Sequence, residues 1–370
     1  MNQYVDRRQP LPRQPVTRRR AIGLAVAGSG AVGLAGLFGR PGFTAAAVGS
    51  TPRRFPAAAD FGDLAVALSW IKDVTFAGAF IADSEGYFAD AGFSSVDFIS
   101  GGGNSLPPTA QLINGDVLVA YSGPESVAAA SLQGGDVKIV GTLFQKNPLA
   151  LISPEDAPIT TPADMAGMRI GVYAGGEAAL EYFLTLNDVD PAEVTQVPTN
   201  YDPLVLTTGE VDGYLGYSFD EPNTLLAHDF PTVVMLYADF GYNSLSQAYA
   251  VLGEDLEGNR DALKSYFAAE IAGWRDNVAD PAMGTDLVVS TYGVDAGLDP
   301  EHQTLQNESQ IPLIASDETA TIGLLTVTEE LAASTIESLA AGGINVTFED
   351  VFDLSLLAEV YQEHPDLLTP

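Results

Sequence analysis

The chain has 370 residues, among them 16 basic and 49 acidic side chains, so its formal net charge is −33. This acidic excess excludes a protein that binds a nucleic-acid backbone or an anionic lipid surface, because such binding needs a basic face. Cysteine is absent, which excludes disulfides, thiolate metal sites, iron–sulfur clusters, cysteine nucleophiles and a lipid-anchored cysteine. Hydrophobic residues make up 46% of the chain, enough for a sizeable core, and the length predicts two or three domains.

Residues 1–47 have the organisation of an export signal. Paired arginines at 18–20 precede a mostly apolar stretch, 21–39, and small residues at 45–47 offer a cleavage site. Paired arginines before a glycine-rich, weakly hydrophobic stretch indicate the twin-arginine route, and so a periplasmic or extracytoplasmic protein. The alternative is that the segment stays uncleaved and tethers the protein to the membrane. Residues 48–62 are predicted to form a linker.

The acidic residues are concentrated after the predicted signal. The first 47 residues contain seven arginines and one acidic residue, which leaves nine basic and 48 acidic residues for the remainder. Repulsion among these charges destabilises a compact chain at low ionic strength, and salt screens it. Two hypotheses explain this composition: a salt-loving source, and a GC-rich genome that enriches alanine, glycine, valine and aspartate.

After the linker, short apolar strands alternate with helices, which predicts an open α/β sheet covered by helices. The first alternating unit has expected strands at 63–70, 96–99, 116–122 and 137–142, and expected helices at 76–88, 109–114 and 124–133. The second unit has expected strands at 150–153, 169–173, 194–197, 213–217 and 232–236, and expected helices at 177–186, 201–208 and 221–227. The apolar segment 246–252 is expected to return the chain to the first unit.

From residue 260 onward the pattern is helical, and we expect these helices to pack on the first unit. The predicted helices are 260–277, 283–292, 300–311 and 320–342, with a last acidic and apolar piece at 348–361. This organisation divides the chain into a first lobe, formed by 63–147 together with 239–370, and a second lobe, 148–238.

Six segments carry a family resemblance through their order and spacing: LSWIKDVTFAGAFIADSEGYFADAGF (68–93), GGGN (101–104), INGDVLVAYSGPES (113–126), KNPLALIS (146–153), TTPADMAGMRIGVYAGGEAALEYFL (160–184) and TTGEVDGYLGYSFDEPNTL (207–225). Together they resemble a solute-binding protein of an ABC importer. More narrowly, the chain is similar to the family that binds pyrimidine precursors of thiamine, whose relatives bind riboflavin, sulfonates or nitrate. The resemblance implies an α/β, two-lobed type II periplasmic-binding-protein fold. It also implies a small-molecule ligand held between the lobes and an ABC permease and ATPase as partners. We expect a monomer.

Loops at the carboxyl ends of parallel strands are where open α/β sheets bind ligands. Four such loops contain the candidate ligand-binding residues Trp70, Phe76, Tyr121, Ser122, Tyr173, Gly175, Gly176, Glu177, Asp220 and Glu221. Aromatic faces stack on a flat ring, and an ionised carboxylate accepts two parallel N–H bonds from an aminopyrimidine edge. The resemblance similarly implies a ligand-binding tryptophan at Trp70 and polar contacts from the loops at 175–177 and 220–222.

Each candidate also has a structural explanation. Trp70 and Phe76 are apolar enough to belong to the core, and paired glycines permit a positive φ before a helix. Glu177 suits the first turn of a helix, and Asp220 is a suitable N-cap. The glycines at 101–103 are compatible with a flexible turn.

The charge of the predicted loops separates the ligand classes. An anion site at a helix N-terminus usually has help from a positive side chain, and Lys72 is the one such residue in these loops. The carboxylates of Glu177, Asp220 and Glu221 repel an anion. We therefore favour a neutral or amino-bearing heterocycle over nitrate or a sulfonate, with riboflavin as an alternative because its ring stacks equally well.

Two other classes of protein are weighed against a transport role. Some relatives implied by the resemblance synthesise the pyrimidine and carry a cysteine-rich motif, which this chain lacks. Its three histidines, at 228, 302 and 364, lie outside the predicted loops, and no calcium-loop pattern occurs. We therefore expect no catalysis, metal or cofactor. A surface sensor is the remaining alternative.

Overall fold

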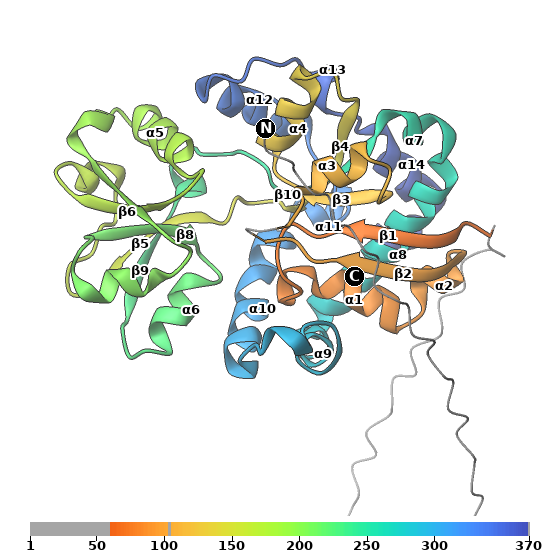
Figure 1. The fold of residues 1–370 in the computed structure, drawn as a ribbon, viewed down its shortest axis with the longest axis horizontal. Coiled ribbons are helices and arrows are strands. Elements are labelled where there is room, and N and C mark those ends of the chain that lie inside the picture. The colour runs from red at the N-terminus through yellow and green to blue at the C-terminus, as the bar shows by residue number, and fades with distance from the viewer. Residues whose placement is uncertain (1–59, 103–104, 369–370) are drawn as a thin grey trace, which may run out of the picture. The chain divides into compact units, whose positions relative to one another are not determined.

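The computed structural model describes residues 60–102 and 105–368. The predicted export signal and most of the predicted linker lie outside the described residues. Two five-stranded sheets organise the described part of the chain, as Figure 1 shows. We call the elements packed around the first sheet lobe 1 and those around the second sheet lobe 2.

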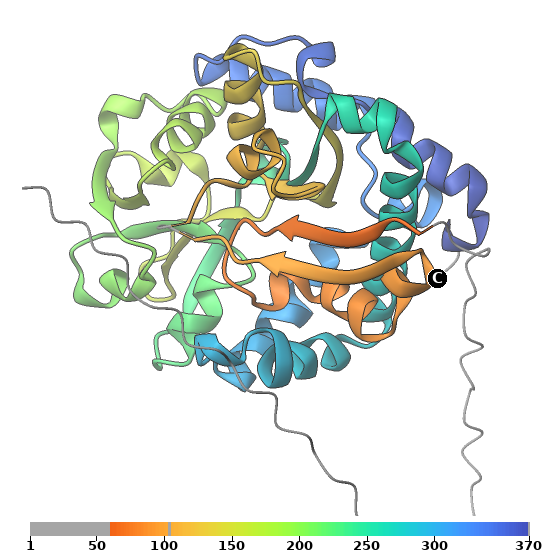
Figure 2. The same ribbon diagram turned by 45° about the vertical axis from the view of Figure 1, so that its right-hand side comes forward.

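The first sheet combines parallel and antiparallel strands. Its strands are β1 (Gly62–Ala67), β2 (Phe93–Ile99), β3 (Val119–Ser122), β4 (Val137–Phe144) and β10 (Ser246–Leu252). The order is β2-β1-β3-β10-β4, with β1 parallel to both β2 and β3. Figure 2 shows β1 and β2 side by side at the edge of the sheet. The segment 246–252 does return to the first sheet, where β10 is antiparallel to β3 and β4.

Helices cover both faces of the first sheet because successive strand residues point to opposite sides. Leu64 and Val66 of β1 belong to one hydrophobic cluster, and Ala67 belongs to another. The first cluster contains side chains from α1 (Ala77–Ser84), α2 (Tyr87–Asp90), α8 (Arg260–Ala279) and α14 (Ser355–Glu363). The second contains side chains from α3 (Pro108–Ile113), α4 (Pro124–Leu132), α12 (Glu329–Ala341) and α13 (Phe348–Val351).

Two glycines, Gly78 of α1 and Gly273 of α8, allow these helices to pack closely. A Cβ at Gly78 would lie 2.3 Å from the ring of Trp274, and a Cβ at Gly273 would lie 2.1 Å from the carbonyl oxygen of Gly78. Any larger residue at Gly78 or Gly273 would force the helices apart. Trp274 is fully buried in this contact, so α8 is firmly attached to lobe 1.

The second sheet has the order β7-β6-β8-β5-β9. Its strands are β5 (Leu149–Pro154), β6 (Arg169–Tyr173), β7 (Thr195–Thr199), β8 (Gly213–Tyr217) and β9 (Thr232–Leu236). The parallel strands β7, β6 and β8 are neighbours, and β5 pairs antiparallel with β8 and β9. Helices α5 (Glu177–Leu186) and α6 (Glu221–Leu226) lie on opposite faces (Figure 1) and contribute to different hydrophobic clusters.

Other helices and short helical turns connect these elements. They are α7 (Gly253–Gly258), α9 (Pro281–Leu287), α10 (Pro300–Ile314), α11 (Thr319–Ile322), the 3-10 turns Val74–Phe76, Pro162–Met165, Pro191–Glu193, Pro203–Thr208, Tyr237–Phe240, Val294–Ala296 and Pro365–Leu368, and the π-helical turn Val288–Tyr292. None of the helices in the described ranges is both long enough and apolar enough to cross a membrane.

One predicted helix is wrong, because 320–342 is not continuous. It is divided between α11 and α12 by a segment in which Gly323 has φ of 95° and Leu325 has φ of 66°. A Cβ at Gly323 would lie 2.1 Å from the Tyr361 ring. The backbone carbonyl of Leu325 also accepts a hydrogen bond from Thr142 N at 2.8 Å. Packing against β4 and Tyr361 therefore overrides the helical pattern.

Two crossovers connect the lobes, one from β4 to β5 and the other before β10. Asn147 joins them. Its Nδ2 donates to the carbonyl oxygen of Ser244 at 2.7 Å, and its Oδ1 accepts from Leu149 N at 2.8 Å. Because Asn147 is 8% exposed, these bonds are shielded from water and hold the crossovers together.

Candidate ligand-binding site

A cavity of about 390 Å³ lies at the carboxyl ends of strands from both sheets. Open α/β sheets bind ligands at this edge. Residues after β1 and in β10 supply the lobe 1 wall, and residues after β6, β7 and β8 supply the lobe 2 wall. The lining residues are Ser69, Trp70, Asp73, Thr75, Gly102, Tyr173, Tyr201, Tyr217, Phe219, Asp220, Glu221, Gln247 and Gln306.

Aromatic rings from both lobes meet at this cavity. The ring centroids of Trp70 and Tyr201 are 5.3 Å apart with an interplanar angle of 55°, and those of Tyr173 and Tyr201 are 5.1 Å apart at 27°. Tyr217 and Phe219 are stacked at 5.7 Å. Tyr201 is 54% exposed, so its ring can move without disturbing the core. The arrangement offers flat apolar faces to a planar ligand.

Three carboxyl groups face the same cavity, and the surroundings of Asp73 and Glu221 disfavour the charged form. Burial raises the pKa of Asp73 to about 7, and the nearby Asp220 adds to this rise. Loss of contact with water raises the pKa of Glu221 to about 8, with Asp220 again the second cause. Asp73 is 5% exposed. A ligand that donates N–H bonds or brings positive charge would relieve this repulsion.

Local sequence explains how Glu221 is positioned. Glu221 is the first residue of α6, and its Oε2 accepts from the backbone N of Tyr217 at 2.6 Å. A Cβ at Gly216 would lie 2.7 Å from the Glu221 carboxyl carbon. A glycine in β8 therefore makes the space into which this carboxylate folds, and one of its oxygens is held by the end of the strand.

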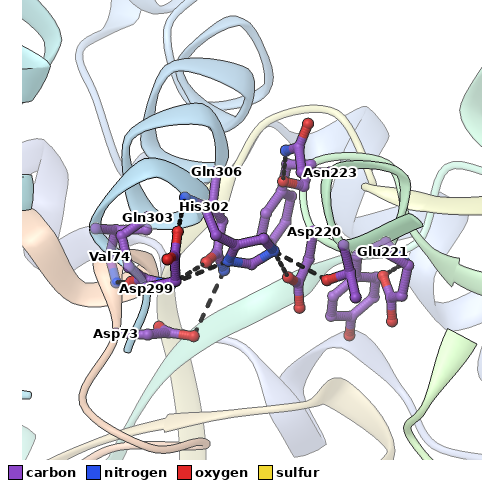
Figure 3. Close-up of polar contacts among 12 residues, drawn as sticks. Asp73, Val74, Asp220, Glu221, Asn223, Asp299, His302, Gln303 and Gln306 are labelled. Carbon is purple, nitrogen blue, oxygen red and sulfur yellow. Dashed lines mark hydrogen bonds and ion pairs between the residues drawn. The ribbon is translucent and has the colours of Figure 1, made fainter. Parts of the chain in front are cut away.

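A polar network beside the cavity links the lobes, as Figure 3 shows. His302 of α10 lies with Nε2 at 3.2 Å from Asp220 Oδ1 and 3.0 Å from Thr224 Oγ1. Asp299 is the N-cap of α10 and accepts from His302 N at 2.8 Å. The Asp220 carboxylate raises the pKa of His302, against a smaller opposing effect of burial. The charge of His302 is therefore coupled to the contact between lobes.

Glutamines extend this network to Asp73. Gln303 Nε2 donates to Gln306 Oε1 at 2.7 Å, and Gln306 Nε2 approaches Asp73 Oδ2 at 3.5 Å. Asp73 caps the turn at Val74–Phe76 by accepting from Thr75 N at 2.9 Å. Asp73 and Asp220 thus lie in the same network from opposite lobes, with His302 the group able to offset their charge.

The structure brings several of the predicted residues together. Trp70, Tyr173, Asp220 and Glu221 line this first cavity. A second cavity, of about 210 Å³, is lined in part by Ser122, Gly175, Gly176 and Tyr173. It shares Ser69, Tyr173, Tyr217 and Gln247 with the first, so the two cavities adjoin.

Three predicted residues need correction, because they line neither cavity. Phe76 is fully buried and packs edge-on against the Tyr121 ring at 4.9 Å. The Tyr121 hydroxyl donates to Glu270, which also accepts from Tyr249 at 3.0 Å. Phe76 and Tyr121 therefore belong to the lobe 1 core. Glu177 is exposed and accepts from Gly175 N at 2.8 Å, which stabilises the turn before α5.

Other lining residues were not predicted. Asp73 and Tyr201 follow β1 and β7, so the same strand-end rule could have found them. Gln247 gave no such signal, since it lies within β10 and has φ of 54°. Across residues 60–102 and 105–368, no group of three or more histidine and acidic side chains is arranged to hold a metal ion.

Comparisons with known proteins agree with this geometry. The sequence profile described as NMT1/THI5 like matches residues 73–283. The riboflavin-binding protein RibY from Chloroflexus aurantiacus is 27% identical over 285 residues, covering 75% of this chain and 80% of RibY.

Solved structures show the same fold at low sequence identity. The periplasmic sulfonate-binding protein SsuA from Methylobacillus flagellatus has a TM-score of 0.61 at 12% identity, covering 83% of this chain and 96% of SsuA. The periplasmic nitrate-binding protein NrtA from Synechocystis has a TM-score of 0.60 at 11% identity, covering 85% and 92%. The desulfurization enzyme DSZB also shares it, with a TM-score of 0.57 at 16% identity, covering 81% and 99%. The predicted α/β, periplasmic-binding-protein fold is confirmed, and the chain belongs to the NMT1/THI5-like family.

Proposed function

We propose that the protein is the extracytoplasmic substrate-binding component of an ABC importer. In this proposal it captures a planar heteroaromatic nutrient, of the thiamine-pyrimidine-precursor class, between the two lobes. The observation that carries the proposal is the meeting of aromatic faces and carboxyl groups in one cavity. Trp70 comes from lobe 1, and Tyr173, Tyr201 and Glu221 come from lobe 2.

The energetics of this cavity suit a ring that donates hydrogen bonds. Each aromatic pair contributes about 0.5–1.5 kcal/mol beyond area burial, and each hydrogen bond to a charged group about 1.5–3 kcal/mol. Two stacks, one bidentate carboxylate contact and the buried area reach about −8 kcal/mol, a micromolar dissociation constant. The free Glu221 oxygen and Asp220 are the groups proposed to accept from an amino-bearing ring edge.

The charge of the cavity argues against anions. Among the described lining residues there are three carboxyl groups and no lysine or arginine. A bound nitrate or sulfonate would lie against Asp73, Asp220 and Glu221, and any ionised carboxylate among them would repel it in a place where water screens charge poorly. The fold shared with sulfonate- and nitrate-binding proteins therefore does not extend, in this proposal, to their ligands.

Riboflavin is the second candidate ligand, and two observations favour it. The relative RibY is a riboflavin-binding protein that aligns over 80% of its own length. The second cavity adds about 210 Å³ of space next to the first, more than a small pyrimidine requires.

Closure of the lobes is the proposed mechanism. Residues 148–238 would move as a body about the crossovers near 143–149 and 238–246, and a ligand that contacts both walls would stabilise the closed form. The closed, ligand-bound monomer would then be recognised by the permease and ATPase subunits. Export by the twin-arginine route would bring the protein to its partners outside the cytoplasm.

The test is to identify what the protein carries. Mass spectrometry of small molecules released from the purified protein is expected to find a planar heteroaromatic compound, and calorimetry with that compound is expected to give a micromolar or tighter dissociation constant. Recovery and tight rebinding of an inorganic anion or an alkanesulfonate instead would contradict the proposal.

A further inference from the structure

The second cavity differs in chemistry from the first. The first has five aromatic side chains in its lining, whereas the second has three tyrosines among a larger number of small and polar residues. These polar members are Ser69, Ser122, Glu125, Asn147, Ser246 and Gln247. A ring placed against Trp70 and Tyr201 would leave this space for a substituent of the ring.

Gln247 lies at the junction of the two cavities, because it lines both. Its φ of 54° is in the left-handed region, which a glutamine inside a β-strand rarely adopts. Backbone conformations of this kind persist where the surroundings enforce them, and they concentrate at ligand sites. Ser69 Oγ donates to Gln247 Oε1 at 2.7 Å, which fixes the direction of the side chain.

Two groups of the second cavity have hydrogen-bonding capacity to offer. Within the described ranges, Gln247 Nε2 and Ser122 Oγ make no hydrogen bond to another protein group, although Ser122 is only 4% exposed. Nε2 can donate to a ligand oxygen, and a serine hydroxyl can both donate and accept. Such groups match the hydroxyls of an alcohol or polyol chain.

Glu125 is the one acidic side chain in the described lining of the second cavity. Its side chain is accessible, yet surrounding protein atoms raise its pKa, as expected for a carboxyl group that faces a cavity. Its Oε2 lies 3.0 Å from where a Cβ on Gly123 would be, so it folds over the start of α4. No lysine or arginine belongs to the described lining of this cavity. A phosphate would therefore meet a carboxylate with no compensating cation.

We propose that the second cavity is a subsite for an uncharged, hydroxyl-bearing substituent of the heteroaromatic ligand, and that Gln247 positions this substituent at the junction of the two cavities. The inference rests on the proposed function, because it assumes that the ring occupies the first cavity. It adds a selectivity to that function: the second cavity would favour ligands with a neutral polar chain over bare rings and over phosphorylated forms.

Three flavins test this subsite because they share a ring and differ in the chain. Riboflavin has a polyol chain, lumiflavin has a methyl group in its place, and riboflavin 5′-phosphate ends in a phosphate. Calorimetry on the ligand-free protein is expected to show that riboflavin binds about tenfold tighter than lumiflavin, which corresponds to one or two hydrogen bonds. Riboflavin 5′-phosphate is expected to bind at least about tenfold more weakly than riboflavin.

Two variants test whether Gln247 and Glu125 cause these differences in affinity. Gln247→Gly removes the amide and also removes the cost of the positive φ, so it does not endanger folding. It is expected to weaken riboflavin about tenfold and to leave lumiflavin nearly unchanged. Glu125→Gln keeps the shape of the side chain and removes its charge, so it is expected to raise the affinity for riboflavin 5′-phosphate relative to riboflavin.

The outcomes separate this inference from the function on which it rests. Equal affinities for riboflavin and lumiflavin, or an equal loss of both in Gln247→Gly, would overturn the subsite and leave the proposed function standing. Absence of binding by both flavins would overturn the subsite as well. The proposed function would fall with it only if aminopyrimidines also failed to bind the same protein.

Discussion

His302 of α10 and Asp220 at the start of α6 form an ion pair between the lobes, with Nε2 3.2 Å from Oδ1. Thr224 of lobe 2 also contacts the imidazole at 3.0 Å. The acidic groups around His302 are Asp220 and, on its own helix, Asp299, with Asp73 reached through Gln306. The pair joins two bodies that the proposed mechanism moves apart, so its protonation should affect closure.

His302→Gln tests this pair. Asp220 raises the pKa of His302, so the stabilisation of the closed form is complete below the ordinary pKa of 6.5 and is lost as the pH rises through the higher value. The ligand affinity of the wild type, divided by that of the variant, is expected to be about two- to fivefold at pH 6 and close to one at pH 9. Calorimetry at both pH values measures this ratio.

The ratio is informative because other titrating groups occur in both proteins and cancel. His228→Gln is the matched control, since that exposed histidine contacts only the carbonyl oxygen of Thr224 within its own lobe. A ratio that does not change with pH would show that the His302–Asp220 pair plays no part in closure.

Glu221→Gln is expected to separate two ligand classes. The variant keeps an oxygen that can accept from Tyr217 N, so the end of β8 is preserved, but it cannot ionise when an aminopyrimidine edge donates to it. We expect affinity for an aminopyrimidine to fall by about 2 kcal/mol, roughly 30-fold, and affinity for riboflavin to change much less. Calorimetry with both ligands measures the difference, and equal losses or no loss would remove Glu221 from the ligand contact.

Stability of the ligand-free protein is expected to fall as the pH rises from about 5 to 8. Burial raises the pKa of Asp73 and of Glu270 to about 7, and loss of contact with water raises that of Glu221 to about 8. The folded protein therefore binds more protons than the unfolded chain in this range, so unfolding becomes easier as protons are lost. Thermal melts across the range check the direction, and a melting temperature that rises would contradict it.

Glu270→Gln isolates one contributor to this pH dependence. Glu270 is fully buried in α8 and accepts from Trp274 Nε1 at 3.0 Å, a bond that an amide oxygen can replace. The variant should melt at a higher temperature than the wild type at pH 8, with a smaller difference at pH 5. An equal effect at both pH values would assign the change to packing rather than to charge.

Much of the fold and part of the site were predictable from short-range patterns. The segments 169–173, 213–217 and 232–236 are strands with the predicted bounds, because each is a short apolar run bounded by turn residues. The rule that ligands bind at strand ends predicted Trp70 as a candidate. Trp70 lines the first cavity together with the predicted Asp220 and Glu221, which follow β8.

The same rule failed where side-chain direction mattered. Tyr121 and Ser122 are neighbours at the end of β3, and successive strand residues point to opposite faces. Tyr121 therefore enters the core while Ser122 reaches the second cavity. Nearness to a strand end does not reveal which of two neighbours faces the ligand, and a strained strand residue such as Gln247 leaves no mark in the sequence.

Trp70 should report ligand binding by fluorescence. The chain has two tryptophans; Trp274 is fully buried in the lobe 1 core, and Trp70 lines the cavity. A heteroaromatic ligand stacked on Trp70 is expected to quench part of the emission. Trp70→Phe should abolish the ligand-dependent change, retain the emission of Trp274, and weaken binding only by about two- to tenfold, since a smaller aromatic face persists. Undiminished quenching in this variant would place the ligand elsewhere.

Asn147→Ala should weaken the junction of the crossovers. The change leaves Ser244 O and Leu149 N without their partners in a shielded place, at an expected cost of about 1–3 kcal/mol in the free energy of unfolding. Urea denaturation measures this cost. Asn243→Ala is the control because Asn243 is an exposed asparagine of the other crossover, next to Ser244. A similar loss in both variants, or none in Asn147→Ala, would contradict the structural role of Asn147.

A calorimetric panel on the ligand-free protein at neutral pH decides whether the aromatic and acidic walls of the cavity select the ligand. The panel contains a 4-aminopyrimidine precursor of thiamine, riboflavin, nitrate and an alkanesulfonate. At least one of the two heteroaromatic compounds is expected to bind with micromolar or tighter affinity, while both anions are expected to give no heat. Tight binding of nitrate or the sulfonate, with neither ring compound bound, would show that the aromatic and acidic walls of the cavity do not select the ligand.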